Sequence, residues 1–583
     1  MLVYGERQRV LQPRSALSDI ARRLSEVGEE PPGLDRHASL AEIFLNLGML
    51  VQGLLDARFE EAGEDEDTPL QADAAQALHS VACPLIASWR AGFLGSLHLD
   101  PAAIKALAAH SLPEQVRCKR PEGYAYYAVY PEAYAQAACD IGEAGLVIGL
   151  RSIGVTLAAA AAAGLGASPP VTLRPVGHPY QRELALSAAL QARLSSTASP
   201  VVVADEGPGR SGSSFGAVGD WFEERGVGVE RLVFMPSHRG DPGPMASRRH
   251  LQRWASVRRP VRELDDLIIH SADERHRLAR WVEHLTGPAL LPLEDISAGR
   301  WRARRDPAHR PPVYAGQERR KFLLTSASGV WLLKFIGLGV AGREAFERAR
   351  RLGEAGLTPR PAGYCYGFLV EPWIEAPPLT PDMPVATVIE AIARYLSFRA
   401  HAFPAEAGQG ASECELRAMI HANVAEGLGA SAALALTSRL PSCEPSLRPM
   451  RVDGRLHRWE WLKTGGGRLL KTDAVDHDDA HDLIGCQDLA WDVAGAEAEF
   501  AFSAADTQAL LDALARSKHS VRPDALAFMR IAYPAFQLGL WTHALEGADS
   551  DDHAPIARLV QGYARRLEAL AASLPCSAPT AGE

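Results

Sequence analysis

The sequence predicts an α/β protein in which a doubly wound parallel-sheet domain is preceded by a helical extension and followed by a bilobal α+β domain. Two apolar runs, 146–150 and 201–204, each lead through a short loop into an apolar helical stretch, as buried parallel strands do. From residue 321 the pattern changes to a β-hairpin, with strands at 321–325 and 329–336. A chain of 583 residues, 47% of them hydrophobic, is too long for one core, so two or three domains are expected.

The loop after the run 201–204 combines two acids with Gly and Ser. Asp205 and Glu206 follow the strand directly, and a helix is expected from Phe215. The small residues just before that helix are Ser211, Gly212, Ser213 and Ser214. Backbone N–H groups at a helix N-terminus suit phosphate, whereas neighbouring acids suit ribose hydroxyls or a hydrated divalent metal. The combination indicates a phosphorylated sugar as ligand.

This segment resembles the signature of type I phosphoribosyltransferases, in which two acids, a short spacer and Thr/Ser-Gly-x-Thr/Ser follow a hydrophobic strand. The spacer from Glu206 to Ser211 is slightly longer than usual, and Ser replaces the commoner Thr. The resemblance implies a glycosyltransferase that binds phosphoribosyl pyrophosphate or a nucleotide with Mg²⁺. It places 211–214 at the 5′-phosphate, and Asp205 and Glu206 as catalytic residues at ribose or metal. The competing interpretation is an ordinary Gly/Ser turn after a buried strand.

A second loop supports the same resemblance. The run 146–150 continues into Arg151, Ser152 and Gly154, followed by an Ala-rich helix that extends to about Gly164. In the family the loop after the first core strand holds pyrophosphate. The resemblance therefore implies that Arg151 supplies positive charge as a third catalytic residue, while Ser152 and the backbone before Gly154 supply hydrogen-bond donors.

Two further segments near these loops have open interpretations. The basic stretch 172–183 is expected either to close over the substrate, with Arg174 and Arg182 at phosphate oxygens, or to be a solvated turn. The Tyr-rich stretch 121–131 is either an aromatic wall for a planar base or the hydrophobic entry to the sheet.

Composition limits the class of protein. A mildly acidic net charge of −10 argues against a dedicated nucleic-acid binder. Eight scattered cysteines without a CxxC pair indicate reduced thiols and no zinc site. We expect a cytoplasmic, bacterial protein with small-molecule partners and no membrane, because the longest apolar run, 157–165, is too short to cross a bilayer. A homo-oligomer remains open.

The second domain begins with a lysine in a hairpin strand and an acid on the next expected helix. Lys334 with Glu344 or Glu347 matches the ion pair that positions nucleotide phosphates in protein-kinase-like folds. The stretch 360–375 resembles the strand and hinge that follow in aminoglycoside-phosphotransferase-like kinases. ATP is therefore a candidate ligand, with Lys334 and Glu344 as nucleotide-binding residues.

The segment from Asp453 to Asp473 resembles the catalytic and metal-binding loops of that kinase family. Aligned on 456–457, it puts Arg455 at the catalytic Asp, Glu460 at the metal-binding Asn and Asp473 at the metal-binding Asp. The later stretch 485–495 resembles the segment whose second acid braces the catalytic loop. An arginine cannot accept a proton from an attacking hydroxyl. Either Asp453 or Glu460 takes over, or the domain binds nucleotide without transferring phosphate.

A dense run of acids and histidines follows Asp473 at 476–482, and is either a Mg²⁺ or Mn²⁺ site or a solvated loop. We expect a helical region at 1–115, a phosphoribosyltransferase-like domain at 116–298 and a linker at 299–314. A kinase-like domain at 315–575 and a tail at 576–583 complete the chain. The predicted function is a phosphoribosyltransferase-like enzyme fused to an atypical or degenerate small-molecule kinase. The alternative is a regulatory protein that uses both folds as nucleotide sensors.

Overall fold

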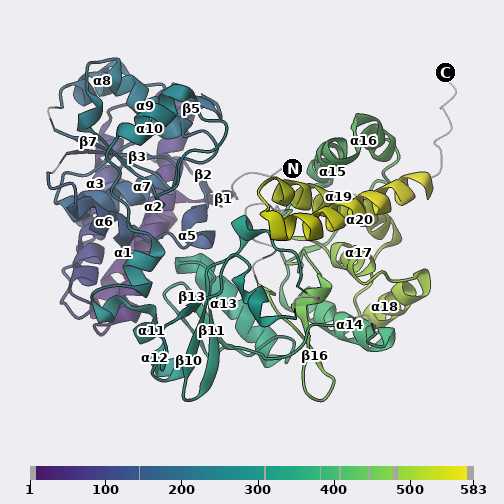
Figure 1. The fold of residues 1–583 in the computed structure, drawn as a ribbon. Coiled ribbons are helices and arrows are strands. Elements are labelled where there is room, and N and C mark those ends of the chain that lie inside the picture. The colour runs from purple at the N-terminus through teal and green to yellow at the C-terminus, as the bar shows by residue number, and fades with distance from the viewer. Residues whose placement is uncertain are drawn as a thin grey trace, which may run out of the picture.

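The computed structural model describes residues 8–143, 145–197, 199–306, 310–380, 382–405, 409–443, 447–475, 477 and 484–573. Figure 1 shows a parallel sheet with its helices on the left and a group of helices from the last part of the chain on the right. An antiparallel sheet lies between them at the bottom of the view.

Helices dominate the first part of the described chain. Its elements are β1 (Gln8–Leu11), α1 (Pro13–Glu29), α2 (Leu34–Ala62), α3 (Pro69–Arg90), α4 (Ala102–Ala108) and β2 (Val116–Lys119), which pairs antiparallel with β1. By length and composition α2 could cross a membrane, but 78% of its most apolar window is buried. It packs against α1, α3 and the later helix α7 (Gly154–Leu165), which is the position of a core helix.

Four parallel strands form the next sheet. In spatial order they are β4 (Val171–Leu173), β3 (Leu146–Leu150), β7 (Val201–Ala204) and β8 (Leu232–Met235). The strands are rich in Val, Ile and Leu because a sheet covered on both faces needs apolar side chains on both. Ile148, for example, lies between Val171 and Val203 and is fully buried.

Helices cover both faces of this parallel sheet. On one face lies α7, and α2, α3 and α6 pack against α7. On the other face, Phe215 and Phe222 of α9 and Trp254 of α10 share a core with Ile148 and Val203. The remaining elements of this part are α5 (Glu122–Tyr126), α6 (Pro131–Cys139), the hairpin β5 (Pro175–His178) and β6 (Gln181–Leu184), α8 (Ala188–Ser195), α9 (Ser213–Glu223), α10 (Arg248–Ser256), α11 (Leu278–Trp281) and α12 (Glu283–Thr286).

The antiparallel sheet contains the expected hairpin. Its strands in spatial order are β12 (Gly363–Cys365), β13 (Phe368–Pro372), β11 (Gly329–Phe335), β10 (Lys321–Ser326) and β9 (Glu294–Asp295). The helix α13 (Gly339–Glu354) connects β11 to β12. The predicted linker includes the 3₁₀ helix η4 (Arg300–Arg304), where Arg302 pairs with Asp552.

The C-terminal part is largely helical. Its helices are α14 (Val385–Ala402), α15 (Glu413–Leu428), α16 (Ala430–Thr437), α17 (Leu489–Glu499), α18 (Ala504–Arg516), α19 (Pro523–Glu546) and α20 (Ser550–Ser573). Two small strand pairs lie among them: β14 (Pro449–Met450) with β17 (Gln487–Asp488), and β15 (Trp461–Lys463) with β16 (Leu469–Lys471). The long helix α19 packs against α15, α17 and α20.

One hydrophobic core crosses from the first part of the chain into the antiparallel sheet. It contains α2 and α7 side chains together with Phe322, Phe335 and Phe368. A polar link lies within it, because the Tyr366 hydroxyl donates to Glu132 Oε1 at 2.7 Å and His37 Nε2 lies 3.0 Å from the same oxygen. The antiparallel sheet is therefore packed against the first part of the chain as well as against α13.

Candidate functional sites

A cleft between the antiparallel sheet and the C-terminal helices collects most of the residues predicted for the second domain. Its cavity has a volume of about 200 Å³. Charged side chains from β10, β11 and the loop 453–460 line it, and Leu332, Leu462 and Trp541 add apolar surface. The segment 371–374, which includes the end of β13 and lies in the stretch predicted as strand and hinge, also lines the cleft.

An ion pair between Lys334 in β11 and Asp473 after β16 crosses this cleft. Lys321 Nζ lies 3.7 Å from the second oxygen of Asp473. Burial raises the pKa of Asp473, but the two ammonium groups outweigh it and hold that pKa well below its usual range. The backbone of Asp473 has a φ of +56°, a left-handed conformation that non-glycine residues adopt rarely and often at functional sites.

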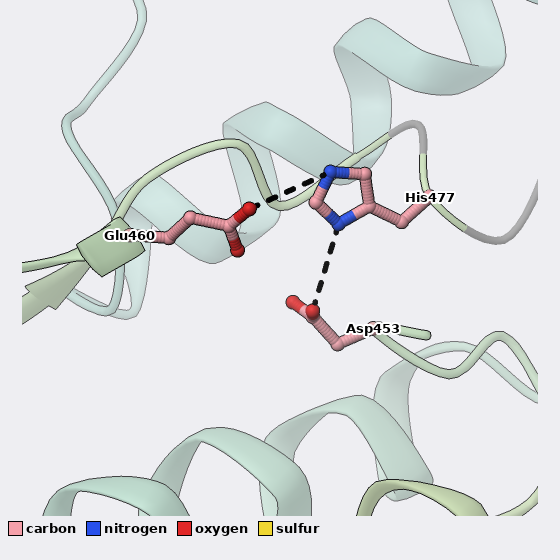
Figure 2. Close-up of side chains that lie close together, drawn as sticks. All are labelled: Asp453, Glu460 and His477. Atoms are coloured by element: carbon pink, nitrogen blue, oxygen red, sulfur yellow. Dashed lines mark ion pairs between the residues drawn. The ribbon is translucent and has the colours of Figure 1, made fainter. Parts of the chain in front are cut away.

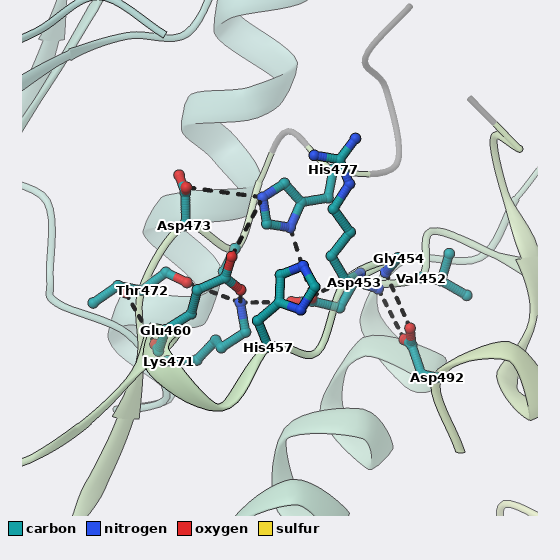
Figure 3. A network of polar contacts seen from close by, with 12 residues as sticks. Val452, Asp453, Gly454, His457, Glu460, Lys471, Thr472, Asp473, His477 and Asp492 are labelled. Atoms are coloured by element: carbon teal, nitrogen blue, oxygen red, sulfur yellow. Dashed lines mark hydrogen bonds and ion pairs between the residues drawn. The ribbon is translucent and has the colours of Figure 1, made fainter. Parts of the chain in front are cut away.

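A second cation, Lys471, is fully buried. Figure 3 shows it beside Glu460 and Asp453. Its Nζ is 2.7 Å from Glu460 Oε2, 3.2 Å from Asp453 Oδ2 and 2.9 Å from the carbonyl oxygen of Thr472. Burial lowers the pKa of Lys471, but the carboxylates of Asp453 and Glu460 outweigh it and raise the pKa above its ordinary value.

The imidazole of His477 lies among three carboxylates. Nδ1 is 3.7 Å from Asp453, and Nε2 is 3.9 Å from Glu460 and 3.8 Å from Asp473. Burial lowers the pKa of His477, but these carboxylates outweigh it and raise the pKa to about 9. The other residues of the predicted cluster, Asp476, Asp478, Asp479, His481 and Asp482, lie outside the described residues.

Asp492 on α17 fixes the loop that contains Asp453 through hydrogen bonds to its backbone. The carboxylate of Asp492 accepts hydrogen bonds from the backbone N–H groups of Asp453 at 2.8 Å and Gly454 at 3.0 Å (Figure 3). The Tyr395 hydroxyl donates to Asp453 at 2.5 Å. Burial raises the pKa of Asp453, but Lys471 and His477 outweigh it and lower the pKa below its usual range. Asp453 is therefore a weak base.

The predicted partner of Lys334 is not Glu344. Glu344 faces arginines instead, with Arg9 at 3.4 Å and Arg120 and Arg451 each at 3.9 Å. The orientation of α13 accounts for the difference, because it turns Glu344 toward these arginines while Asp473 reaches Lys334.

Arg455, predicted at the catalytic position, lines the cleft and donates to Gln317 at 3.2 Å. Sequence reasoning missed Lys471. The available signal was strand alternation, which puts residues 471 and 473 on the same face of an extended segment.

The resemblance to kinases implies Mg²⁺ in this cleft, held by Asp473 and Glu460. Figure 2 shows Asp453, Glu460 and His477 converging, each with a ligand atom within 4.8 Å of the others. Mg²⁺ prefers an octahedron of oxygen ligands. Here Lys471 contacts both Asp453 and Glu460, Lys334 pairs with Asp473, and His477 lies among all three carboxylates, so these oxygens already face cationic groups of the chain. The described residues, as arranged, do not fit Mg²⁺.

A second candidate site lies at the carboxyl ends of β7 and β8. A pocket of about 630 Å³ is lined by Glu206, Ser237 and His238, by the Tyr-rich segment 127–134, and by Arg262 and Arg320. The Tyr-rich segment is mostly buried, yet it also forms one wall of this pocket. The stretch 121–131 is thus partly buried and partly at the pocket, and its role as a wall for a planar base stays a prediction.

The predicted phosphate loop is capped by the β5–β6 hairpin. The hydroxyls of Ser211 and Ser213 both donate to the carbonyl oxygen of Pro179 at the hairpin turn, at 3.4 and 2.7 Å. The four residues 211–214 span the start of α9, as expected for an anion cradle. In this arrangement the carbonyl oxygen of Pro179 accepts hydrogen bonds that the two hydroxyls could otherwise donate to a phosphate.

The two arginines predicted to meet pyrophosphate and phosphate oxygens are already paired. Arg151 is almost fully buried and forms ion pairs with Asp56 and Asp65, which come from α2 and the loop after it. Arg174 pairs with Asp56 as well. Their position corrects the expectation of free cations, because the N-terminal helices supply the counter-charges.

The remaining predicted ligands are less constrained. Arg182 in β6 donates to the carbonyl of Pro175 at 3.3 Å, and Ser152 lies half-buried before α7. Gly154 begins α7, and a Cβ at this residue would lie 2.6 Å from the carbonyl oxygen of Ala204. The absence of a side chain there lets α7 approach the sheet closely.

No protein-family model matches the sequence, and no curated protein matches it. Similar solved structures include choline kinase LicA from Streptococcus pneumoniae (19% identity, TM-score 0.31, 42% of this chain and 89% of that chain). Macrolide 2′-phosphotransferase MphH from Brachybacterium faecium is 16% identical with a TM-score of 0.29, and the match covers 41% of this chain and 88% of that chain. Spectinomycin phosphotransferase APH(9)-Ia, in complex with ADP and spectinomycin, is 12% identical with a TM-score of 0.31, and the match covers 51% of this chain and 97% of that chain. These similarities are too low to carry an argument about this chain.

Proposed function

We propose that the cleft around Lys334 and Asp473 binds a nucleotide, as the ligand site of a small-molecule kinase-like module. The observation that carries this proposal is the Lys334–Asp473 ion pair, which joins a sheet strand to the loop after β16. In phosphoryl-transfer folds a strand lysine meets the nucleotide phosphates and an acid across the cleft lies at the same place. The support of the loop 453–460 by Asp492 agrees with this assignment.

The same geometry favours ligand binding over phosphoryl transfer. A general base must accept a proton in a productive position, and its pKa should lie near the working pH. Asp453 is buried against Lys471 and Tyr395 and has a lowered pKa, and Arg455 cannot accept a proton. We therefore place the module closer to a nucleotide sensor than to an active kinase.

Replacing Lys334 by Met should abolish nucleotide binding, because it removes the ammonium that faces the ligand. The measurement is equilibrium binding of ATP, ADP and GTP, accompanied by ligand-dependent thermal stabilisation. The matched control is Lys463→Met, at an exposed lysine of β15, which should bind like the wild type. Full ATP stabilisation of a folded Lys334→Met protein would contradict the assignment.

We also propose, as a second candidate, that the pocket beside Glu206 binds a phosphoribosyl ligand. Two acids at the carboxyl end of a parallel strand, an adjacent helix N-terminus and a pocket of about 630 Å³ support it. The proposal has no support from the compared structures and rests on these features and the sequence pattern.

Combining Asp205→Asn with Glu206→Gln should eliminate binding of phosphoribosyl pyrophosphate and ribose 5-phosphate while leaving the melting temperature of the free protein unchanged. Titration calorimetry checks the first expectation and thermal unfolding the second. Glu224→Gln, at an exposed acid after α9, is the control. A lowered melting temperature with unchanged binding would assign the two acids a purely structural role.

A further inference from the structure

The carboxylates of Asp453, Glu460 and Asp473 form ion pairs with lysines of the chain itself. Lys471 places three oxygen atoms within 2.7–3.2 Å of its ammonium, from Glu460, Thr472 and Asp453. A lysine ammonium has three N–H donors, so all three can be used in this arrangement. The side chain of Lys471 has no exposed surface, so water does not compete for these contacts.

Among the described residues that line the cleft, acids do not outnumber basic side chains. Its described lining contains five arginines and lysines and four acids. The basic residues are Arg305, Arg319, Lys321, Lys334 and Arg455, and the acidic residues are Glu318, Glu371, Glu460 and Asp473. A divalent cation entering among them would have to displace Lys334 from Asp473 and Lys471 from Glu460, whereas phosphate oxygens would compete with Asp473 for Lys334 and leave Lys471 in place.

From these contacts we propose that the ammonium of Lys471 takes the position beside Asp453 and Glu460 that a bound metal ion would otherwise have. The site would then bind nucleotide phosphates without a divalent metal. This inference rests on the proposed nucleotide-binding function. The single ammonium of Lys471 bridges the carboxylates of Asp453 and Glu460, and Lys321 and Lys334 contribute positive charge to the lining of the cleft. To replace Lys471, a metal would have to expel an ammonium whose side chain is fully buried.

The test compares nucleotide and metal binding separately. ATP should bind the wild-type full-length protein with the same affinity, within about twofold, in EDTA and in Mg²⁺, since a twofold change is only about 0.4 kcal/mol. Binding in Mg²⁺ that is lost in EDTA would overturn the inference while leaving the proposed function intact. Absence of ATP binding in both conditions would overturn the proposed function itself.

Mn²⁺ alone, followed by electron paramagnetic resonance, gives a readout that needs no nucleotide. The wild type should show no Mn²⁺ site that depends on Glu460, and Lys471→Met should gain one stoichiometric site. Lys463→Met should gain none, and Glu460→Gln combined with Lys471→Met should lose the gained site. A wild-type Mn²⁺ site that disappears in Glu460→Gln would overturn the inference. If Lys471→Met does not fold, the comparison of wild type with Glu460→Gln still decides.

Discussion

Replacing Arg151 by Met should lower the free energy of unfolding by about 3–5 kcal/mol, because it leaves the buried carboxylate of Asp65 without the guanidinium that pairs with it. The side chain of Arg151 is 1% exposed, and that of its partner Asp65 is 3% exposed. Burial raises the pKa of Asp65 even with Arg151 present, so loss of the guanidinium would favour its protonation further. Urea unfolding with a fixed m-value would measure the loss.

The matched control for Arg151 is a surface arginine in the same part of the chain. Arg193 pairs with Asp67 at 2.7 Å, but both side chains are substantially exposed. Arg193→Met should therefore change stability by less than about 1 kcal/mol. Adding Asp65→Asn to Arg151→Met should recover part of the loss. Unchanged stability together with lost binding of phosphoribosyl pyrophosphate would instead restore Arg151 to the pyrophosphate role.

Asp492→Ala is expected to be comparably damaging and to remove nucleotide binding with it. The substitution leaves the N–H groups of Asp453 and Gly454 buried without acceptors, and each such loss costs about 1–3 kcal/mol. The expected total is about 2–6 kcal/mol, read from chemical unfolding. Nucleotide binding should fall because the loop 453–460 loses the support that fixes its conformation.

Two comparisons make the Asp492 result specific. Asp492→Asn keeps one carbonyl acceptor and should be milder than Ala. Asp512→Ala, at an exposed acid of α18, should stay within about 0.5 kcal/mol of the wild type. If Asp492→Ala matched Asp512→Ala in stability and ATP binding, the supporting role of Asp492 would be refuted.

The parts of the structure that could be predicted from sequence are those with a local cause. The strands 146–150 and 201–204 follow from runs of branched apolar residues, and the hairpin follows from alternation around a turn at 327–328. The kinase resemblance selects Lys334 and Asp473 as site residues, but it pairs Lys334 with Glu344 or Glu347 and does not predict the Lys334–Asp473 contact. These features depend on neighbours in sequence or on a spaced motif.

The features that could not be predicted depend on distant partners. Asp56 and Asp65 meet Arg151 from more than 80 residues away, and nothing in either segment marks the pairing. The kinase analogy predicts Glu344 as a partner of Lys334, but the packing of α13 against the first part of the chain turns Glu344 toward Arg9. Lys471 is an ordinary strand lysine until the fold encloses it with Glu460.

The hydrophobic core that α2 and α7 share with the antiparallel sheet bears on which parts of the gene can be expressed separately. Phe322, Phe335 and Phe368 are covered by residues encoded before the predicted linker at 299–314. A gene fragment that began after this linker would expose that apolar face to water, at a cost of about 25 cal/mol for each Å² uncovered. The strands β10, β11 and β13, which line the cleft around Lys334, therefore depend for their packing on helices at residues 34–62 and 154–165.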